Sequence, residues 1–193
     1  MSAAWRAAIP VQTRRLVLRE PAFGDVARVE RYAGDQAVAT MLAAVPVPFT
    51  EAHASAFIGD LLASNLAGGG LGLAVARTKA PGDLIGVVTF AGSGSSADIG
   101  WWFGRPHWGK GFASEAVAAM IDLAFTDPAL ETLTAGAFTD NPASLRVQEK
   151  LGFERLGESR KQSLARGALV PHIDTKLTRA AWLSKQAQAR PGA

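Results

Sequence analysis

The sequence contains no cysteine and only three histidines, which narrows the chemistry open to it. Without cysteine, the chain has no disulfide, no thiolate nucleophile and no cysteine metal site. The histidines, His53, His107 and His172, stand far apart and show no ligand spacing such as HExxH. We therefore expect no metal site in this protein.

Long hydrophobic runs are also missing. The longest, Met41 to Phe49, is interrupted by two prolines. It falls far short of the roughly 20 apolar residues that span a bilayer. The N-terminal segment lacks the continuous apolar stretch of a signal peptide. We expect a cytoplasmic protein that does not bind membranes.

The chain also lacks a large excess of either positive or negative charge. The formal net charge is +3, and the basic residues are scattered along the chain rather than gathered in one stretch. A nucleic-acid-binding surface needs clustered lysine and arginine, so we expect no nucleic-acid partner. A mildly basic chain of this kind could instead bind a small molecule that carries phosphates.

Strand and helix patterns cover most of the chain. A length of 193 residues with 48% hydrophobic content suits a single domain over residues 1–193. Its core is expected at about 13–182, followed by a frayed tail, Gln186 to Ala193. Strands are predicted at residues 16–19, 71–76, 84–90, 97–103, 132–138, 153–162 and 169–177, and helices at 25–33, 50–66, 111–125 and 142–151.

The order of these elements predicts an α/β fold with a mixed sheet. The strand-helix-strand segment across Ala97 to Phe138 should form a right-handed crossover, which makes its two strands parallel. Short turns join the three strands that precede the crossover helix, so those strands should be antiparallel. We find no internal repeat and no linker, and we expect helices on both faces of the sheet.

The turn Gly109-Lys110-Gly111 lies between a predicted strand and a predicted helix. Helix N-termini carry unpaired N–H groups and partial positive charge, and glycine lets the backbone approach an anion closely. The turn is therefore either a phosphate cradle or a tight turn that uses glycine for its dihedral angles alone. Two nucleotide motifs fail nearby: Gly104 to Gly111 lacks the Ser or Thr of a Walker A loop, and Gly92 to Ala97 leads into a strand rather than a helix.

A second helix begins at Asn141-Pro142-Ala143-Ser144. Asparagine is a favoured N-cap residue and proline a favoured first helical residue. This helix and the helix after Gly111 each follow one strand of the predicted parallel pair. Their N-termini should therefore direct N–H donors to the same end of the sheet.

Four stretches of the chain together resemble the GCN5-related N-acetyltransferases (GNAT), most of all the branch of ribosomal-protein alanine and serine N-acetyltransferases (RimJ/RimL-like). The opening "TRRLVLRE" resembles the first strand of that branch, and the likeness extends from Thr13 to Trp182. The resemblance implies a single domain with a mostly antiparallel sheet of about seven strands and a splayed parallel pair. The stretches are residues 13–20, 97–103, 108–116 and 141–153.

The resemblance also implies a binding site for acetyl-CoA, the acyl-donor substrate. The family's pyrophosphate loop has the form Q/R-x-x-G-x-G/A, and here Trp108 stands in the Q/R place, with Gly111 and Ala113 in the small-residue places. Lys110 and Lys150 would face the phosphates. The implied binding residues are Trp101, Trp102, Phe103, Trp108, Gly109, Lys110, Gly111, Phe112, Ala113, Ser114, Asn141 and Ser144.

The implied reaction is direct acetyl transfer to a primary amine. Asp98 matches the position of a glutamate base in some members, one methylene shorter, so we expect it to act through water or, alternatively, only to hold the preceding loop. The tyrosine acid of many members has no counterpart, because the only tyrosine is Tyr32 in the first helix. Ser144 matches the serine of the ribosomal branch and could assist the leaving thiolate or simply belong to the helix. His107 and His172 are proton carriers or packing residues.

The acceptor is not identified by the sequence. A protein N-terminus, an amino acid, a polyamine or an antibiotic all supply a primary amine, and the protein itself could be a monomer or a homodimer. The last predicted hairpin carries a basic rim or a simply solvated set of charges: Arg155, Arg160, Lys161 and Arg166. Two alternatives remain: a non-catalytic acyl-CoA-binding or regulatory module, and a generic nucleotide-phosphate binder.

Overall fold

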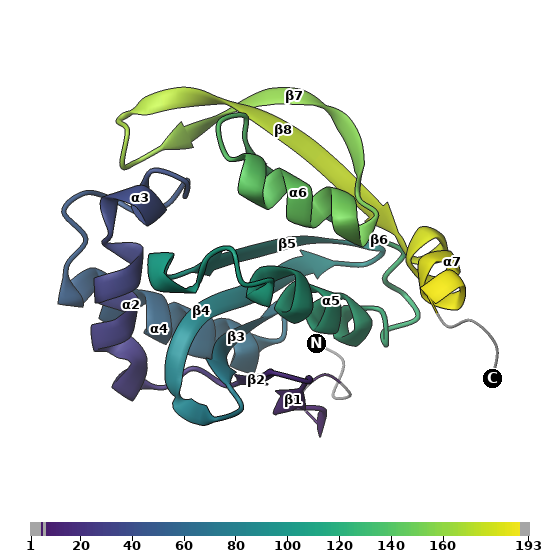
Figure 1. Cartoon of the computed structure of the whole chain (residues 1–193), viewed down its shortest axis with the longest axis horizontal. Coiled ribbons are helices and arrows are strands. Elements are labelled where there is room, and N and C mark those ends of the chain that lie inside the picture. Colours follow the sequence, from purple (N-terminus) through teal and green to yellow (C-terminus); the bar gives the residue numbers. More distant parts are fainter. Residues whose placement is uncertain (1–4, 6, 190–193) are drawn as a thin grey trace.

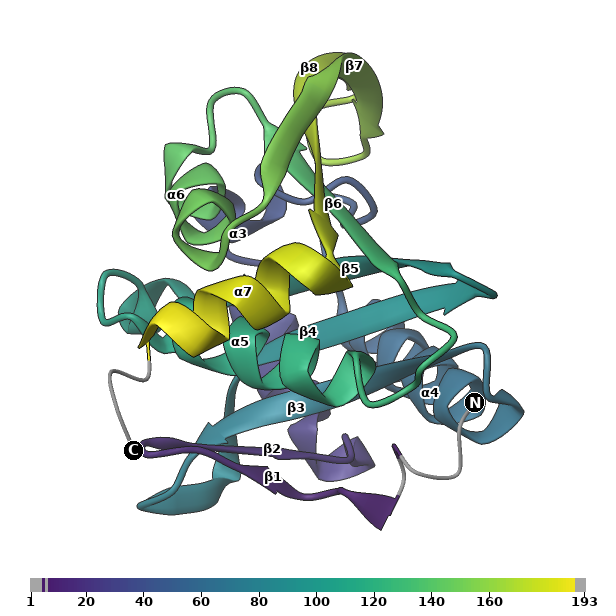
Figure 2. The same cartoon turned by 90° about the vertical axis from the view of Figure 1, so that its right-hand side faces the viewer.

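A computed structural model describes residue 5 and residues 7–189 of the chain. One sheet runs through the molecule, with helices packed on both of its faces (Figure 1, Figure 2). The strands are β1 (Val11–Gln12), β2 (Leu16–Arg19), β3 (Gly70–Arg77), β4 (Ala80–Ser93), β5 (Ser96–Phe103), β6 (Thr132–Phe138), β7 (Glu154–Ser163) and β8 (Ala168–Thr178). The helices are η1 (Phe23–Asp25), α2 (Val26–Ala33), α3 (Gln36–Ala39), α4 (Glu51–Ala67), η2 (Arg105–His107), α5 (Phe112–Ala124), α6 (Pro142–Leu151) and α7 (Arg179–Ala189).

The predicted α/β class and mixed sheet are confirmed. The strand order is β1-β2-β3-β4-β5-β6-β8-β7, and of these neighbours only β5 and β6 run parallel. The sheet has eight strands rather than about seven, because β1 adds two residues that pair with β2. Two residues are too few to show an alternating pattern, which is why the sequence does not reveal this strand.

Local capping rules set the predicted helix ends. Thr50 is the N-cap of α4, and Gly68 ends that helix in the left-handed conformation. Asn141 caps α6, with Pro142 as its first residue, and Gly152 ends it with φ of 94°. The short α3 carries no strong pattern and is not predicted from the sequence.

The C-terminal segment is more ordered than expected. Helix α7 continues to Ala189, so residues 186–189 of the expected frayed tail are helical, and residues 190–193 lie outside the described part of the chain. Trp182 anchors this helix: it is buried, and its indole N–H donates to the Asp122 carboxylate at 2.8 Å. Burial of one large aromatic side chain explains why the segment docks.

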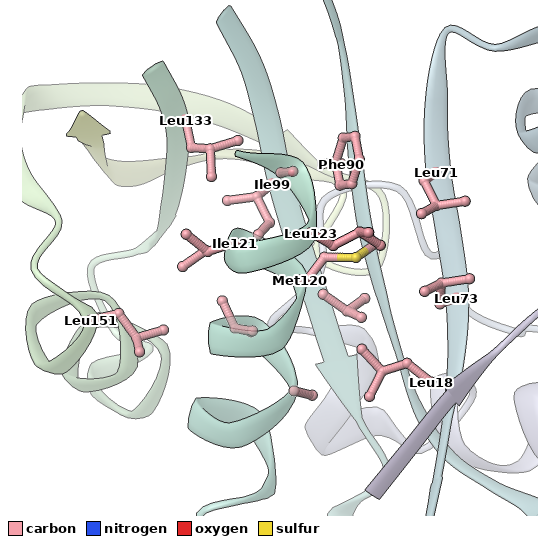
Figure 3. Packing of buried hydrophobic residues seen from close by; sticks show 14 of the residues in the cluster. Leu18, Leu71, Leu73, Phe90, Ile99, Met120, Ile121, Leu123, Leu133 and Leu151 are labelled. Carbon is pink, nitrogen blue, oxygen red and sulfur yellow. The ribbon is translucent and has the colours of Figure 1, made fainter. Parts of the chain in front are cut away.

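Two hydrophobic cores lie on opposite faces of the sheet. The larger joins the sheet to α5 and α6 and includes Leu71, Phe90, Ile99, Met120 and Leu133 (Figure 3). The smaller lies between the sheet and helices α2 and α4. The α2–α4 layer covers β3 and β4, while α6 packs on β6 from the other side. The contacts of α2 and α4 with the sheet thus centre on β3 and β4 rather than on β6, β8 and β7.

Strands β5 and β6 separate soon after they meet. They pair only from Ser96 to Asp98 on β5 and from Thr132 to Thr134 on β6. Beyond Asp98, β5 stays bonded to β4 and β6 stays bonded to β8, so the sheet opens into a V. This opening places two strand edges and two helix N-termini around one gap.

Candidate functional site

A cavity of about 680 Å³ occupies the gap between β5 and β6. This volume lies within the roughly 300–1,000 Å³ typical of small-molecule sites. The N-terminal turns of α5 and α6 line it on one side. Residues of α3 and the loop after it, together with β8, line it on the other. The cavity thus passes between the two faces of the sheet.

The start of α5 has the geometry of an anion cradle. Gly109 and Gly111 have φ of 71° and 74°, a conformation that favours glycine. The first helical hydrogen bond joins the Glu115 N–H to the Gly111 carbonyl, so the N–H groups of residues 112–114 precede the helical ladder. Gly109, Gly111, Phe112, Ala113 and Ser114 all line the cavity. The glycine turn and the N–H groups that precede the helical ladder therefore lie together at the cavity.

A network centred on Arg15 fastens this loop to the N-terminal part of the sheet. The Arg15 Nε donates to Glu115 at 2.6 Å, and its Nη1 donates to the Lys110 carbonyl at 3.0 Å. Thr13 adds a 2.6 Å hydrogen bond to the same carboxylate. Burial opposes the charge on Glu115, but these hydrogen bonds outweigh it and hold the pKa of that carboxyl below its usual value. The "TRR" stretch, noticed only as a strand start, therefore also positions the cradle.

The cations near the cradle differ from those expected. Lys110 does not line the cavity, and its ammonium donates to the Pro106 carbonyl at 2.7 Å. Lys150 lies in the last turn of α6, at the end away from the N-terminus that faces the gap. Arg146, one turn into α6, does line the cavity and was missed by the sequence analysis. Its position four residues after Pro142 was the available signal, because residues i and i+4 share a helix face.

The three aromatic residues of β5 that were expected at the site divide between the two cores. Trp101 packs on the α5 side, and Phe103 is buried there. Trp102 points to the opposite side, where it meets Phe57 of α4 with ring centroids 6.3 Å apart. The Trp108 indole donates to the Phe103 carbonyl at 2.7 Å, which ties the loop to the end of β5. Trp101, Trp102, Phe103 and Trp108 all contribute to the cavity wall.

The N-terminus of α6 brings Asn141 and Ser144 to the cavity. The Asn141 side-chain oxygen accepts from the Ser144 N–H at 3.1 Å, the expected N-cap bond. The buried Gln148 amide donates to the Ser144 hydroxyl at 3.3 Å, and its own oxygen accepts from Thr175 at 2.7 Å. Because Ser144 is the acceptor in the bond from Gln148, its hydroxyl proton is free to donate.

Asp98 lies at the point where β5 and β6 part. Its side chain is exposed, lines the cavity and accepts from the Thr134 hydroxyl at 3.0 Å. Strand alternation puts Asp98 on the same face as Trp102, the face that α4 covers further along the sheet. The carboxylate therefore stands on the opposite side from the α5 cradle.

Part of the cavity wall comes from segments far from Asp98 in the sequence. Val38, Met41, Leu42 and Ala43 supply apolar surface. The tip of the β7–β8 hairpin is bonded to this segment, because the Leu164 N–H donates to the Ala43 carbonyl at 2.9 Å. Of the four cations expected to form a basic rim, only Lys161 lines the cavity.

The other three basic side chains of the hairpin have protein partners. Arg155 pairs with Glu158 at 2.6 Å, and Arg160 donates to the Leu169 carbonyl at 2.7 Å. Arg166 pairs with Asp140 at 2.7 Å, a contact that lowers the pKa of this carboxyl. These three side chains therefore bond to other parts of the protein and do not form a cationic rim around the cavity.

His107 meets Tyr32 beside the cradle. The His107 Nε2 lies 3.3 Å from the Tyr32 hydroxyl, and the two rings meet edge to face. Burial and the nearby positive charges of Lys110, Arg77 and Arg28 lower the pKa of this imidazole. Tyr32 does not line the cavity, whereas His107 does. These contacts agree with the interpretation of His107 as a packing residue at the cavity edge.

Comparison with known proteins identifies the family. Residues 15–154 match the family model described as the acetyltransferase (GNAT) domain. The chain belongs to this GNAT family. The uncharacterized N-acetyltransferase YnaD of Bacillus subtilis is 30% identical over 160 residues, which cover 78% of this chain and 86% of that protein. Other curated Bacillus relatives reach 42% identity, but the chain spans only about half of their length.

Solved GNAT structures share the fold at low sequence identity. The microcin C7 self-immunity acetyltransferase MccE, in complex with acetyl-CoA and AMP, has a TM-score of 0.75 at 18% identity, covering 86% of this chain and 93% of that chain. RimJ of Mycobacterium smegmatis, in complex with a CoA disulfide, has a TM-score of 0.74 at 23% identity, covering 91% and 90%. The expected resemblance to RimJ-type proteins is thus confirmed at the level of the fold.

Two further findings concern the described residues only. They contain no helix that is both long and apolar enough to cross a membrane. They also contain no group of three or more histidine, aspartate or glutamate side chains that could hold a metal ion.

Proposed function

We propose that this GNAT protein transfers an acetyl group from acetyl-CoA directly to a primary amine in a ternary complex. One observation carries the proposal: a single cavity joins the N–H donors of α5 to the carboxylate of Asp98 through the opening between β5 and β6. The donor would enter from the α5 side and the amine from the Asp98 side. Their reacting atoms would meet in the gap.

The residues of this chain fit an acyl-CoA donor. The unpaired N–H groups at the start of α5 suit a diphosphate, and Arg146 would add positive charge beside it. The edge of β5 beyond Asp98, at Trp101 to Phe103, has no pairing to β6 and would bond the amide-bearing pantetheine arm. Asn141 would hydrogen-bond the same arm. Lys110 would reach the phosphates only after releasing the Pro106 carbonyl.

Three groups beside the gap would carry out the acetyl transfer: a backbone N–H of β5, the Asp98 carboxylate and the Ser144 hydroxyl. A backbone N–H near Trp101 or Trp102 would stabilise the tetrahedral oxyanion, a contribution of about 3 kcal/mol for one well-aimed donor. Asp98 would attract a cationic acceptor and take its ammonium proton through water, leaving a neutral amine. Ser144 would donate its hydroxyl hydrogen bond to the departing thiolate.

The cytoplasmic location expected from the sequence stays a prediction.

Coenzyme A binding and thiol release test the proposal. We expect coenzyme A to raise the melting temperature and ATP to raise it less, because only the former has an arm that fills the β5–β6 gap. With acetyl-CoA and a panel of protein N-terminal peptides, amino acids, polyamines and aminoglycosides, free thiol should appear with at least one amine. Stabilisation by coenzyme A without turnover would instead identify a binding module, and equal stabilisation by ATP would identify a nucleotide-phosphate binder.

Replacement of Ser144 by alanine should lower kcat about 10- to 100-fold. The lost hydrogen bond to a developing thiolate is worth about 1.5–3 kcal/mol and exists only in the transition state. The KM for acetyl-CoA should stay close to that of the wild type, and the shift in melting temperature caused by coenzyme A should be retained. An unchanged kcat would show that Ser144 is an ordinary helix residue.

A further inference from the structure

One face of β5, β6 and β8 carries polar residues beside the cavity. The register pairs Asp98 with Thr134, Gly136 with Asp174, and Phe138 with His172. Because alternate residues share a face, Asp98, Asp174 and His172 all project to the same side of the sheet. This is the side on which the acceptor would enter. His172 and Asp98 both line the cavity.

The His172 imidazole is held in one orientation. Its Nδ1 lies 2.9 Å from the Asp174 carboxylate, and its ring meets Phe138 edge-on with centroids 5.9 Å apart. The ring lies over Gly136, where a Cβ would overlap it. The Nδ1–H group donates a hydrogen bond to the Asp174 carboxylate, so the lone pair of the ring is on Nε2. Among the described residues, no group hydrogen-bonds Nε2.

The surroundings of His172 favour its neutral form, mainly because the ring is buried. Burial and the positive charge of Lys161 on β7 lower the pKa of the imidazole, while Asp174 on β8 and Asp98 on β5 oppose that shift. The pKa of Asp174 is itself lowered, first by the Ser159 hydroxyl and then by His172, so this carboxyl stays ionised and keeps the tautomer in place. A neutral imidazole with an unpaired Nε2 is a competent proton acceptor.

Acetylation of an amine that binds as an ammonium releases two protons from nitrogen. The first must leave before the nitrogen can attack, and Asp98 with water is placed for that step. The second leaves as the N–C bond forms, because the attacking nitrogen becomes cationic and acidic. The C–S bond then breaks, the sulfur takes the electron pair, and the thiolate takes one proton from water. One proton in all passes to solvent.

We propose that His172, oriented by Asp174, is the acceptor of this second proton: Nε2 takes it as the amine nitrogen bonds to the acyl carbon. The proposal rests on the proposed function and adds a catalytic residue to it. His172 then returns the proton to solvent before the next turnover. Asp174 is a positioning residue, because it acts through the imidazole.

Substitution of His172 by glutamine tests the assignment. We expect kcat/KM for the amine to fall about 10²- to 10⁴-fold, the usual contribution of a general base. The melting-temperature shift produced by coenzyme A should be unchanged, because the donor side of the cavity is untouched. His53 to glutamine is the matched control and should keep the full rate, since His53 is exposed on α4 and does not line the cavity.

The pH dependence of kcat/KM distinguishes a catalytic His172 from one that only packs, because a packing residue would not set the position of the acidic limb. Activity needs neutral His172, so the acidic limb of kcat/KM should follow its pKa and disappear in the glutamine variant. Asp174→Asn removes a contact that raises this pKa, so the limb should move to lower pH. Lys161→Met removes a charge that lowers it, so the limb should move to higher pH. A limb that stays in place in both variants would overturn the proposal.

A measurement on the resting protein keeps the proposal testable if no amine in the panel reacts. In ¹⁵N-labelled protein, the His172 resonances should show a neutral ring protonated at Nδ1 and a pKa below the ordinary value of about 6.5. A proton on Nε2, or a ring that does not titrate, would contradict the assignment. Failure of coenzyme A to shift the melting temperature of the wild type would instead count against the proposed function as a whole.

Discussion

Replacement of Ser114 by glutamate should weaken coenzyme A binding at least about 100-fold while the fold stays at least as stable. Ser114 lies in the first turn of α5 and lines the cavity. A carboxylate about 4 Å from a diphosphate costs about 4 kcal/mol per pair of charges at an effective dielectric constant of 20. The same charge at a helix N-terminus stabilises the helix by about 0.3–1 kcal/mol.

The substitution is expected to lower the affinity for coenzyme A but not the stability of the fold, so the two measurements separate damage to the site from damage to the fold. Titration calorimetry with coenzyme A measures the affinity, and thermal unfolding without ligand measures the stability. Ser114→Gln is the matched control, because it has the same size without the charge and should bind far more tightly than the glutamate variant. Equal loss in both variants would mean that bulk rather than charge closes the site. Unimpaired binding to the glutamate variant would place the phosphates elsewhere.

Replacement of Asp25 by alanine should lower the free energy of unfolding by about 3 kcal/mol or more. The carboxylate is 2% exposed and accepts two bonds from Arg19, at 2.8 and 2.7 Å, and one from the Ala22 N–H at 2.9 Å. Removal of one partner leaves a partly buried guanidinium without its counter-charge, which typically costs about 3–5 kcal/mol. Urea denaturation should show a lower midpoint, and the melting temperature should drop by about 6–12 °C.

A double variant separates the ion pair from simple loss of packing. Arg19→Met in the Asp25→Ala background removes the unpaired charge and should recover part of the lost stability. Neither residue lines the cavity, so the affinity for coenzyme A of the folded variants should match the wild type. A double variant less stable than the single one would show that Arg19 acts mainly through its bonds to the Pro81 and Gly82 carbonyls.

The two helix starts that line the cavity were predictable because short stretches of sequence determine them. Asn141 and Pro142 determine the start of α6 through bonds within the next three residues. Gly109 and Gly111 determine the turn before α5 through their own backbone conformation. Adjacent strand order then follows from the crossover rule, which brings both helix N-termini to one gap.

The face of the sheet that carries Asp98 and His172 was harder to predict because its residues meet only through strand register. His172 and Asp98 come from strands on either side of the opening, and neither has a local motif. Arg146 was missed because its signal, a spacing of four residues from Pro142, is one that many exposed helix residues share. Lys110 was expected at the phosphates, yet its side chain turns back to the carbonyl of Pro106, a choice among rotamers that no spacing encodes.

By itself the sequence determined most of the strands and helices, where most of the predicted helices stop, and the glycine turn before α5. These features depend on hydrogen bonds and dihedral angles within a few residues. Only the tertiary structure decided that Arg15 holds Glu115 across 100 positions of the chain, that β5 and β6 part after Asp98, and that His172 shares a face with Asp98. Such contacts depend on how whole elements pack, which is set by the summed burial of two cores rather than by any local pattern.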